Sequence, residues 1–106
     1  MIGFVGLIRQ DHGQGEVGWA LAAEHRGQGY ATEAAGALIA YGFYSLGLRR
    51  IHADTGIDNL ASMRMMERLG MRREGLLRGA VYEEGKWVDR VAYAILVDEW
   101  HDANRR

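Results

Sequence analysis

The segment from Arg26 to Thr32, with the sequence RGQGYAT, places a permanent cation and two glycines between a predicted strand and a predicted helix. Successive backbone N–H groups at a helix start converge on one point and carry partial positive charge, which favours an anion there. Gly27 and Gly29 have no side chains that would hold a phosphate away from the backbone. The segment therefore predicts a phosphate or diphosphate site, although a Gly-rich loop that merely turns the chain would look the same.

A second group of candidate residues is the segment Asn59 to Ser62, which follows the third predicted strand. Asn59 can cap the helix that starts after it, with Ser62 in the first turn. That strand is expected to run parallel to the second one, and ligands in such sheets bind outside the carboxyl ends of parallel strands. Asn59 and Ser62 should then face whatever the Arg26 loop binds, whereas a purely structural helix cap is the alternative for this segment alone.

Several carboxylates could act as a general base. Glu16 starts the second predicted strand and Asp54 ends the third, while Glu33, Glu83 and Glu84 lie elsewhere in the chain. A carboxylate can take a proton from a nucleophile when burial raises its pKa towards neutral. For each residue taken singly, a solvated surface position is the more common role.

These side chains must be positioned by regular elements, whose order follows from the hydrophobic periodicity. We expect strands at 2–9, 16–22, 50–55, 71–82 and 86–97, helices at 30–46 and 60–69, and a polar, frayed tail at 98–106. The strand–helix–strand step implies one parallel pair, and the hairpins at both ends imply antiparallel pairs. The predicted fold is therefore α/β (α+β), a mixed, mostly antiparallel five-stranded sheet with two helices in a single domain over residues 1–106.

Composition excludes several classes of function. With 106 residues, 48% hydrophobic and 25% charged, the chain has the composition of one soluble globular domain. A net charge of −1 argues against nucleic-acid binding. No apolar run approaches the roughly 20 residues of a membrane span, and no signal peptide is evident. The absence of cysteine fits a cytoplasmic protein, and the four histidines lack metal-ligand spacing, so we expect no metal site.

The chain resembles the GNAT superfamily of N-acetyltransferases. Its signature, Arg/Gln-x-x-Gly-x-Gly/Ala, is matched by Arg26, Gly29 and Ala31 after the strand EVGWAL. The downstream sequences LGLRRIHADTGIDNLASMRMMERLGMRREGLLRG and GKWVDRVAYAIL resemble the branch that acetylates ribosomal-protein N-termini. The resemblance extends over residues 2–100 but starts at the third strand of the family, so the domain is expected to be short at its N-terminus.

The resemblance implies acetyl-coenzyme A as cosubstrate and a primary amine as acceptor, either a protein N-terminus or a small amine. The pantetheine arm would pair with the second strand like an added strand, and Asn59 would bind its acetyl end. The residues implied in binding the cosubstrate are Trp19, Ala20, Leu21, Arg26, Gly27, Gln28, Gly29, Tyr30, Ala31, Thr32, Asn59 and Ser62.

The implied reaction is direct attack of the amine on the thioester in a ternary complex. Glu16 is the expected base, because family members often place one on this strand. Many relatives carry a tyrosine where this chain has Met66, so Ser62 is the candidate that protonates the leaving thiolate.

Two other functions stay open, a non-catalytic coenzyme A-binding module with a regulatory or assembly role and a purely structural domain. The first strand lacks the family's preceding elements and is expected to be a bare edge. We therefore predict a homodimer formed through that edge.

Overall fold

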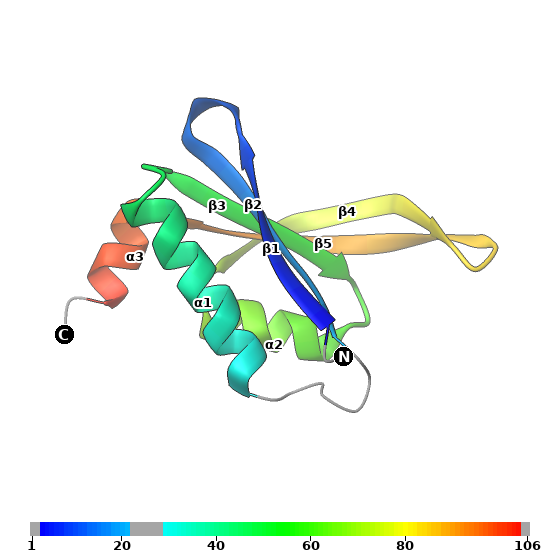
Figure 1. The fold of residues 1–106 in the computed structure, drawn as a ribbon. Helices are drawn as coiled ribbons and strands as arrows, with labels where there is room; N and C mark the ends of the chain where they lie inside the picture. The colour runs from blue at the N-terminus through cyan, green and yellow to red at the C-terminus, as the bar shows by residue number, and fades with distance from the viewer. Residues whose placement is uncertain (1–2, 22–28, 105–106) are drawn as a thin grey trace.

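The computed structural model describes the backbone of residues 3–21 and 29–104 and the side chains of residues 5–19 and 32–104. The elements in chain order are β1 (Gly3–Gln10), the 3-10 turn η1 (Asp11–Gly13), β2 (Gln14–Leu21), α1 (Gly29–Tyr44), β3 (Arg50–Gly56), α2 (Leu60–Arg68), β4 (Arg72–Glu83), β5 (Lys86–Leu96) and α3 (Val97–Ala103). Figure 1 shows α1 and α2 together beneath the sheet.

The five strands form one sheet in the order β1-β2-β3-β5-β4. The β2–β3 pair is parallel, and the other three pairs are antiparallel. The mixed, mostly antiparallel sheet that the sequence predicted is therefore confirmed. The strand–helix–strand connection through α1 gives the parallel pair, because a parallel neighbour needs a crossover of this length.

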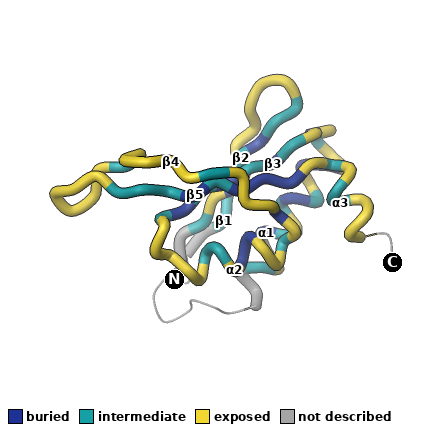
Figure 2. Tube along the Cα trace, turned by 180° about the vertical axis from the view of Figure 1, so that it is seen from behind, coloured by how far each residue is buried: buried dark blue, intermediate teal, exposed yellow. Residues whose placement is uncertain are grey.

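The core lies between one sheet face and the two helices. On β3 the buried residues alternate with half-buried ones, so that Ile51, Ala53 and Thr55 face the helices. Ile39 from α1 and Met66 from α2 pack against this face. Figure 2 shows buried segments on the strands and helices that meet there. Helix α1 approaches the sheet closely at Gly42, where a Cβ atom would lie 3.0 Å from Ile51 Cδ1. A glycine at this position therefore sets the distance between helix and sheet.

The C-terminal segment differs from the prediction. A frayed tail was expected from Asp98, but the chain forms the helix α3, the third α-helix where two were predicted. The Glu99 side chain accepts a hydrogen bond from the Leu96 backbone N–H at 2.9 Å, and Trp100 packs on Phe43 with ring centroids 5.8 Å apart. The prediction was wrong because these two contacts, and not a long apolar stripe, stabilise this short helix.

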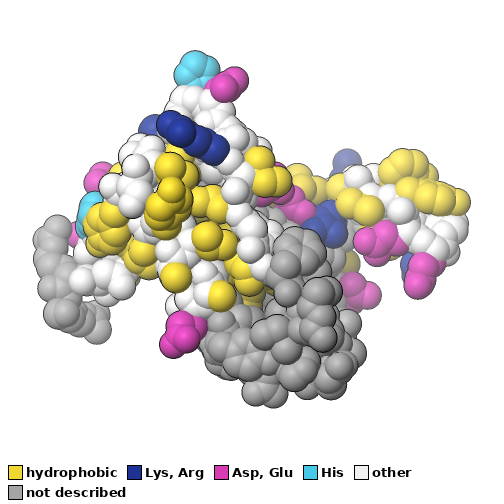
Figure 3. All heavy atoms as spheres, viewed as in Figure 1, with side chains coloured by type: hydrophobic (Ala, Val, Ile, Leu, Met, Phe, Trp, Pro, Cys, Tyr) yellow, Lys and Arg dark blue, Asp and Glu magenta, His cyan; other side chains and the backbone are white. Residues whose placement is uncertain are grey.

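The hairpin of β4 and β5 extends away from the rest of the molecule as an arm (Figure 1). Tyr82 and Trp87 form an edge-to-face pair near its tip, with ring centroids 5.3 Å apart, and both are largely exposed. Figure 3 shows hydrophobic side chains gathered at this end of the arm. Among the described residues, no helix is long and apolar enough to span a membrane.

Candidate functional site

The parallel strands β2 and β3 pair only at their starts. Their register runs from Gln14↔Arg50 to Glu16↔His52 and then stops. Both strands continue, and each keeps its other neighbour: β2 pairs with β1 as far as Leu21, and β3 pairs with β5 as far as Gly56. Between residues 17–21 and 53–56 two strand edges therefore face each other without pairing, and we call this opening the slot.

A cavity of about 390 Å³ lies at the slot. Its walls come from the ends of β2 and β3, the turn before α2, the first turn of α2, and the arm. The lining residues are Glu16, Val17, Gly18, Trp19, Asp54, Thr55, Gly56, Asp58, Asn59, Ser62, Glu83 and Arg90. The structure thus brings together six residues that the sequence singled out separately, namely Glu16, Trp19, Asp54, Asn59, Ser62 and Glu83.

Asn59 and Ser62 are held at the start of α2. The Asn59 side-chain oxygen accepts the Ser62 backbone N–H at 3.1 Å, which confirms the predicted helix cap. The Trp19 indole Nε1–H donates a hydrogen bond to Ser62 Oγ at 3.2 Å. This second bond joins β2 to α2, so both walls of the cavity are connected beside the slot.

The cavity lining is acidic. It contains Glu16, Asp54, Asp58 and Glu83 but only one cation, Arg90. Arg90 Nε donates to Asp54 Oδ1, and Arg90 Nη2 donates to the Asp54 carbonyl oxygen at 3.0 Å. Within the described part of the chain the other three carboxylates have no hydrogen bond or ion pair. The cavity therefore offers negative charge to a cationic ligand.

The sequence pointed to Glu16, Asp54 and Glu83 as carboxylates of interest but not to Asp58. It predicted Arg90 on a solvated face, whereas the structure places Arg90 in the cavity lining. Arg90 reaches the cavity because the β3–β5 register places it opposite Gly56, next to Asp54. The alternation of Arg90 with the buried Val91 was the available signal. It could not be used without knowing which strand lies next to β5.

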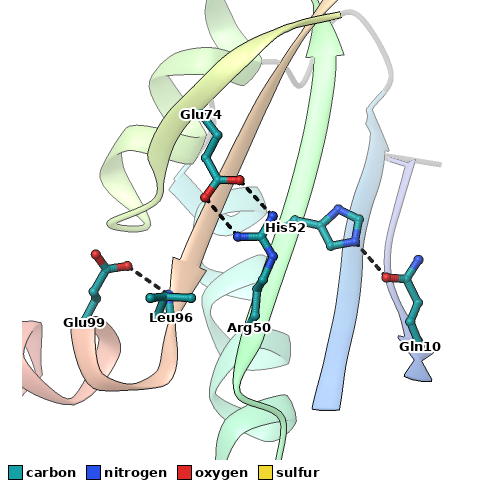
Figure 4. A network of polar contacts seen from close by, with 6 residues as sticks. All are labelled: Gln10, Arg50, His52, Glu74, Leu96 and Glu99. Atoms are coloured by element: carbon teal, nitrogen blue, oxygen red, sulfur yellow. Dashed lines mark hydrogen bonds and ion pairs between the residues drawn. The ribbon is translucent and has the colours of Figure 1, made fainter. Parts of the chain in front are cut away.

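The other end of β3 carries a different polar group, shown in Figure 4. Arg50 donates two hydrogen bonds to the Glu74 carboxylate, at 2.9 and 2.8 Å, and His52 Nε2 lies 2.8 Å from Gln10 Oε1. The Arg50 guanidinium lowers the pKa of Glu74, mainly through this hydrogen bonding. These side chains satisfy one another and lie outside the cavity.

The predicted phosphate loop is described only in part. Arg26, Gly27 and Gln28 lie outside the described residues. Helix α1 begins at Gly29, which confirms that the segment opens a helix, and Thr32 is half-buried in its first turn. For Ala20, Leu21, Tyr30 and Ala31 the structure gives the backbone, in β2 and α1. Their roles stay predictions.

Comparison with known proteins identifies the family of this chain. Residues 1–72 match the acetyltransferase (GNAT) domain. The chain belongs to the GNAT family. This confirms the resemblance and the GNAT-like core that the sequence predicted.

Three relatives illustrate the range of the family around this GNAT domain. The Bacillus subtilis protein named uncharacterized N-acetyltransferase YnaD is 41% identical over 81% of this chain and 51% of its own length. The spermidine/spermine N-acetyltransferase SpeG of Vibrio cholerae has a TM-score of 0.86 at 27% identity, covering 97% of this chain and 63% of that one. The ribosomal-protein-S5-alanine acetyltransferase of Vibrio fischeri has a TM-score of 0.84 at 29% identity, covering 93% and 56%.

The chain thus spans about half the length of the curated relatives it matches. Within the described residues, no group of three or more His, Cys, Asp or Glu side chains is arranged to hold a metal ion.

Proposed function

We propose that this GNAT domain transfers the acetyl group of acetyl-coenzyme A to a primary amine, in a protein N-terminus or a small molecule. The observation that carries the proposal is the slot, where the β2–β3 pairing stops after Glu16 and His52. Unpaired strand edges offer backbone N–H and C=O groups to an extended chain, in the manner of an added strand. A pantetheine arm has amide groups that suit such an edge.

The start of α1 would bind the part of the cosubstrate that lies farthest from the acetyl group. The backbone of residues 26–32 would bind the diphosphate, because the N–H groups of a helix start are unsatisfied and carry partial positive charge. Helix α1 follows strand β2 in the chain, and this order supports a diphosphate site beyond the end of β2.

The residues around the cavity have complementary roles in the transfer. Glu16 would accept the proton that the attacking amine must lose, directly or through a water. Backbone N–H groups of Trp19, Ala20 and Leu21 would stabilise the oxyanion of the tetrahedral intermediate. Ser62 would donate a hydrogen bond to the departing thiolate. Because the sequence has no cysteine, a thioester on the enzyme is excluded and direct transfer is the simplest route.

The acidic lining supports an amine as acceptor. A protonated amine is attracted to a cavity in which carboxylates outnumber cations, and it can lose its proton to one of them on arrival. The two named neighbours are a spermidine/spermine acetyltransferase and a ribosomal-protein-S5-alanine acetyltransferase, so both a polyamine and an alanine N-terminus are acceptors to assay.

The test combines binding with product formation. Calorimetric titration with acetyl-coenzyme A should show binding that Gly29→Val weakens strongly and Gly6→Val leaves unchanged. Gly6 is the matched control because a Cβ there meets no atom within 4 Å. Mass spectrometry should then detect acetylated spermidine or acetylated alanyl peptide. Binding without product would favour a non-catalytic coenzyme A-binding module, and no binding would leave only a structural domain.

We further propose that the domain forms a homodimer through β1. This strand is at the edge of the sheet, and Ile8 on it is 63% exposed. An open edge pairs readily with another chain. Light scattering should give the mass of a dimer, and a monomeric mass would contradict this proposal.

A further inference from the structure

Trp19 and Ser62 form a hydrogen bond beside the cavity although 43 residues separate them in the chain. Trp19 lies in β2, and the edge of this strand faces the slot. Ser62 lies in the first turn of α2. Such a contact between a strand and a distant helix start fixes the serine relative to the slot.

The direction of this bond is fixed by chemistry. An indole N–H can only donate, so the Ser62 oxygen must accept. A serine in a helix often donates its own proton back to the carbonyl four residues earlier. Among the described residues Ser62 Oγ has no bond besides that to Trp19, and Ser62 lines the cavity. Its hydroxyl proton is therefore free to be donated to a ligand there.

Both partners are held in place by their surroundings. The Trp19 ring packs against Ala35 of α1 and Met65 of α2. The backbone of Ser62 is held by the cap bond to Asn59. Because the indole is fixed by packing and the serine by its backbone, the Trp19 bond selects one position for Ser62 Oγ.

We propose that Trp19 is a positioning residue, which holds Ser62 so that the serine donates its hydrogen bond to the sulfur that leaves during acetyl transfer. This inference rests on the proposed function. When the C–S bond of the tetrahedral intermediate breaks, its electron pair moves to sulfur, and the Ser62 O–H stabilises that charge while keeping its proton. The amine proton goes to Glu16, and solvent supplies the proton that finally neutralises the thiolate. Donation by the indole polarises the serine hydroxyl and strengthens it as a donor.

The first test needs no activity. The chain has three tryptophans, so its ¹H–¹⁵N spectrum should contain three indole signals. Ser62→Ala should shift the indole proton of Trp19 and leave those of Trp87 and Trp100 in place. Trp100 provides an internal reference, because its buried Nε1 has no hydrogen-bond partner within the described structure. An unmoved Trp19 signal would overturn the inference.

The second test is kinetic. Trp19→Phe keeps an aromatic ring but removes the donor, and it should lower kcat about tenfold, the factor for one ordinary hydrogen bond, with little change in the KM for acetyl-coenzyme A. The same substitution should have no effect on kcat in a Ser62→Ala background, because Trp19 acts through Ser62. In a Ser62→Thr background, which retains a hydroxyl, Trp19→Phe should again lower kcat. Trp100→Phe is the control for replacing a half-buried tryptophan by phenylalanine.

The outcomes separate this inference from the proposed function. If Trp19→Phe lowers kcat equally in the wild-type and the Ser62→Ala backgrounds, Trp19 acts only by packing. That result would overturn the positioning role, while the proposed acetyl transfer would still stand. A wild-type protein that acetylates no amine would overturn the proposed function, and the positioning role with it, even if the indole signals behave as expected.

Discussion

The two ends of β3 carry polar side chains of opposite character. Near its start, Arg50 is paired with Glu74 and His52 with Gln10. Near its end, Asp54 is paired with Arg90, but Glu16 and the other cavity carboxylates have no partner in the described part of the chain. Glu16 is half-buried, and a half-buried charge without a partner is costly to a fold unless a ligand provides the partner, whereas Asp58 and Glu83 are exposed. We propose that the first group supports the sheet and that the second serves a substrate.

The strongest test of this difference between the two ends of β3 is to neutralise one carboxylate in each group. Glu16→Gln should lower kcat for acetyl transfer about 100-fold or more, which is the usual contribution of a general base, without lowering the melting temperature. Glu74→Gln should leave kcat unchanged. Steady-state kinetics and thermal unfolding of both variants measure this, and equal activity losses would remove the distinction.

Arg90 is the cation that pairs with Asp54 at the cavity. Arg90→Met should destabilise the protein by about 1–2 kcal/mol, because it leaves a half-buried carboxylate without its charged donor. It should also add an unpaired negative charge to the cavity and lower the KM for a polyamine. Urea unfolding gives the first effect and initial rates the second; a variant with unchanged stability would show that the Arg90–Asp54 bond contributes nothing.

The unpaired carboxylates should act on a cationic acceptor through charge. The double variant Asp58→Asn, Glu83→Gln should raise the KM for spermidine about fivefold at low salt, as expected for losing roughly 1 kcal/mol of charge interaction in water. The effect should shrink as salt is added, because salt screens exposed charges. A salt-independent change in KM would mean that these side chains act by shape instead.

The smallest effect on stability is expected for the Arg50–Glu74 pair near the start of β3. Arg50→Met should cost less than about 1 kcal/mol at neutral pH, since the pair is partly exposed to solvent. Arg50 lowers the pKa of Glu74 in the folded protein, so its contribution is present above the ordinary pKa of glutamate and is lost as the pH falls through the lowered value. The stability difference between Arg50→Met and wild type, measured by urea unfolding, should therefore vanish in acid.

Much of the fold could be predicted because periodicity is local. The strands and both longer helices follow from apolar residues at fixed steps, and glycines with positive φ follow α1 and α2, at Gly47 and Gly70. Helix α3 was missed because the contact of Trp100 with Phe43, which stabilises it, joins residues far apart in the chain.

The candidate site was predictable only as separate pieces. Asn59, Ser62 and Glu16 were named from caps and strand positions, and the sheet topology placed them at one end. Two features were not predicted, namely the end of the β2–β3 pairing after Glu16 and the approach of Arg90 to Asp54. Both depend on the register between strands, which residue spacing within one strand does not determine.

The short contact between β2 and β3 also has a mechanical consequence. Among the described residues only three pairs join the β1–β2 hairpin to the rest of the sheet, so core packing and the Trp19–Ser62 hydrogen bond hold most of the hairpin in place. A molecule bound along both free edges would tie the two parts together. Such a molecule would complete the sheet and add main-chain hydrogen bonds where β2 and β3 form none with each other.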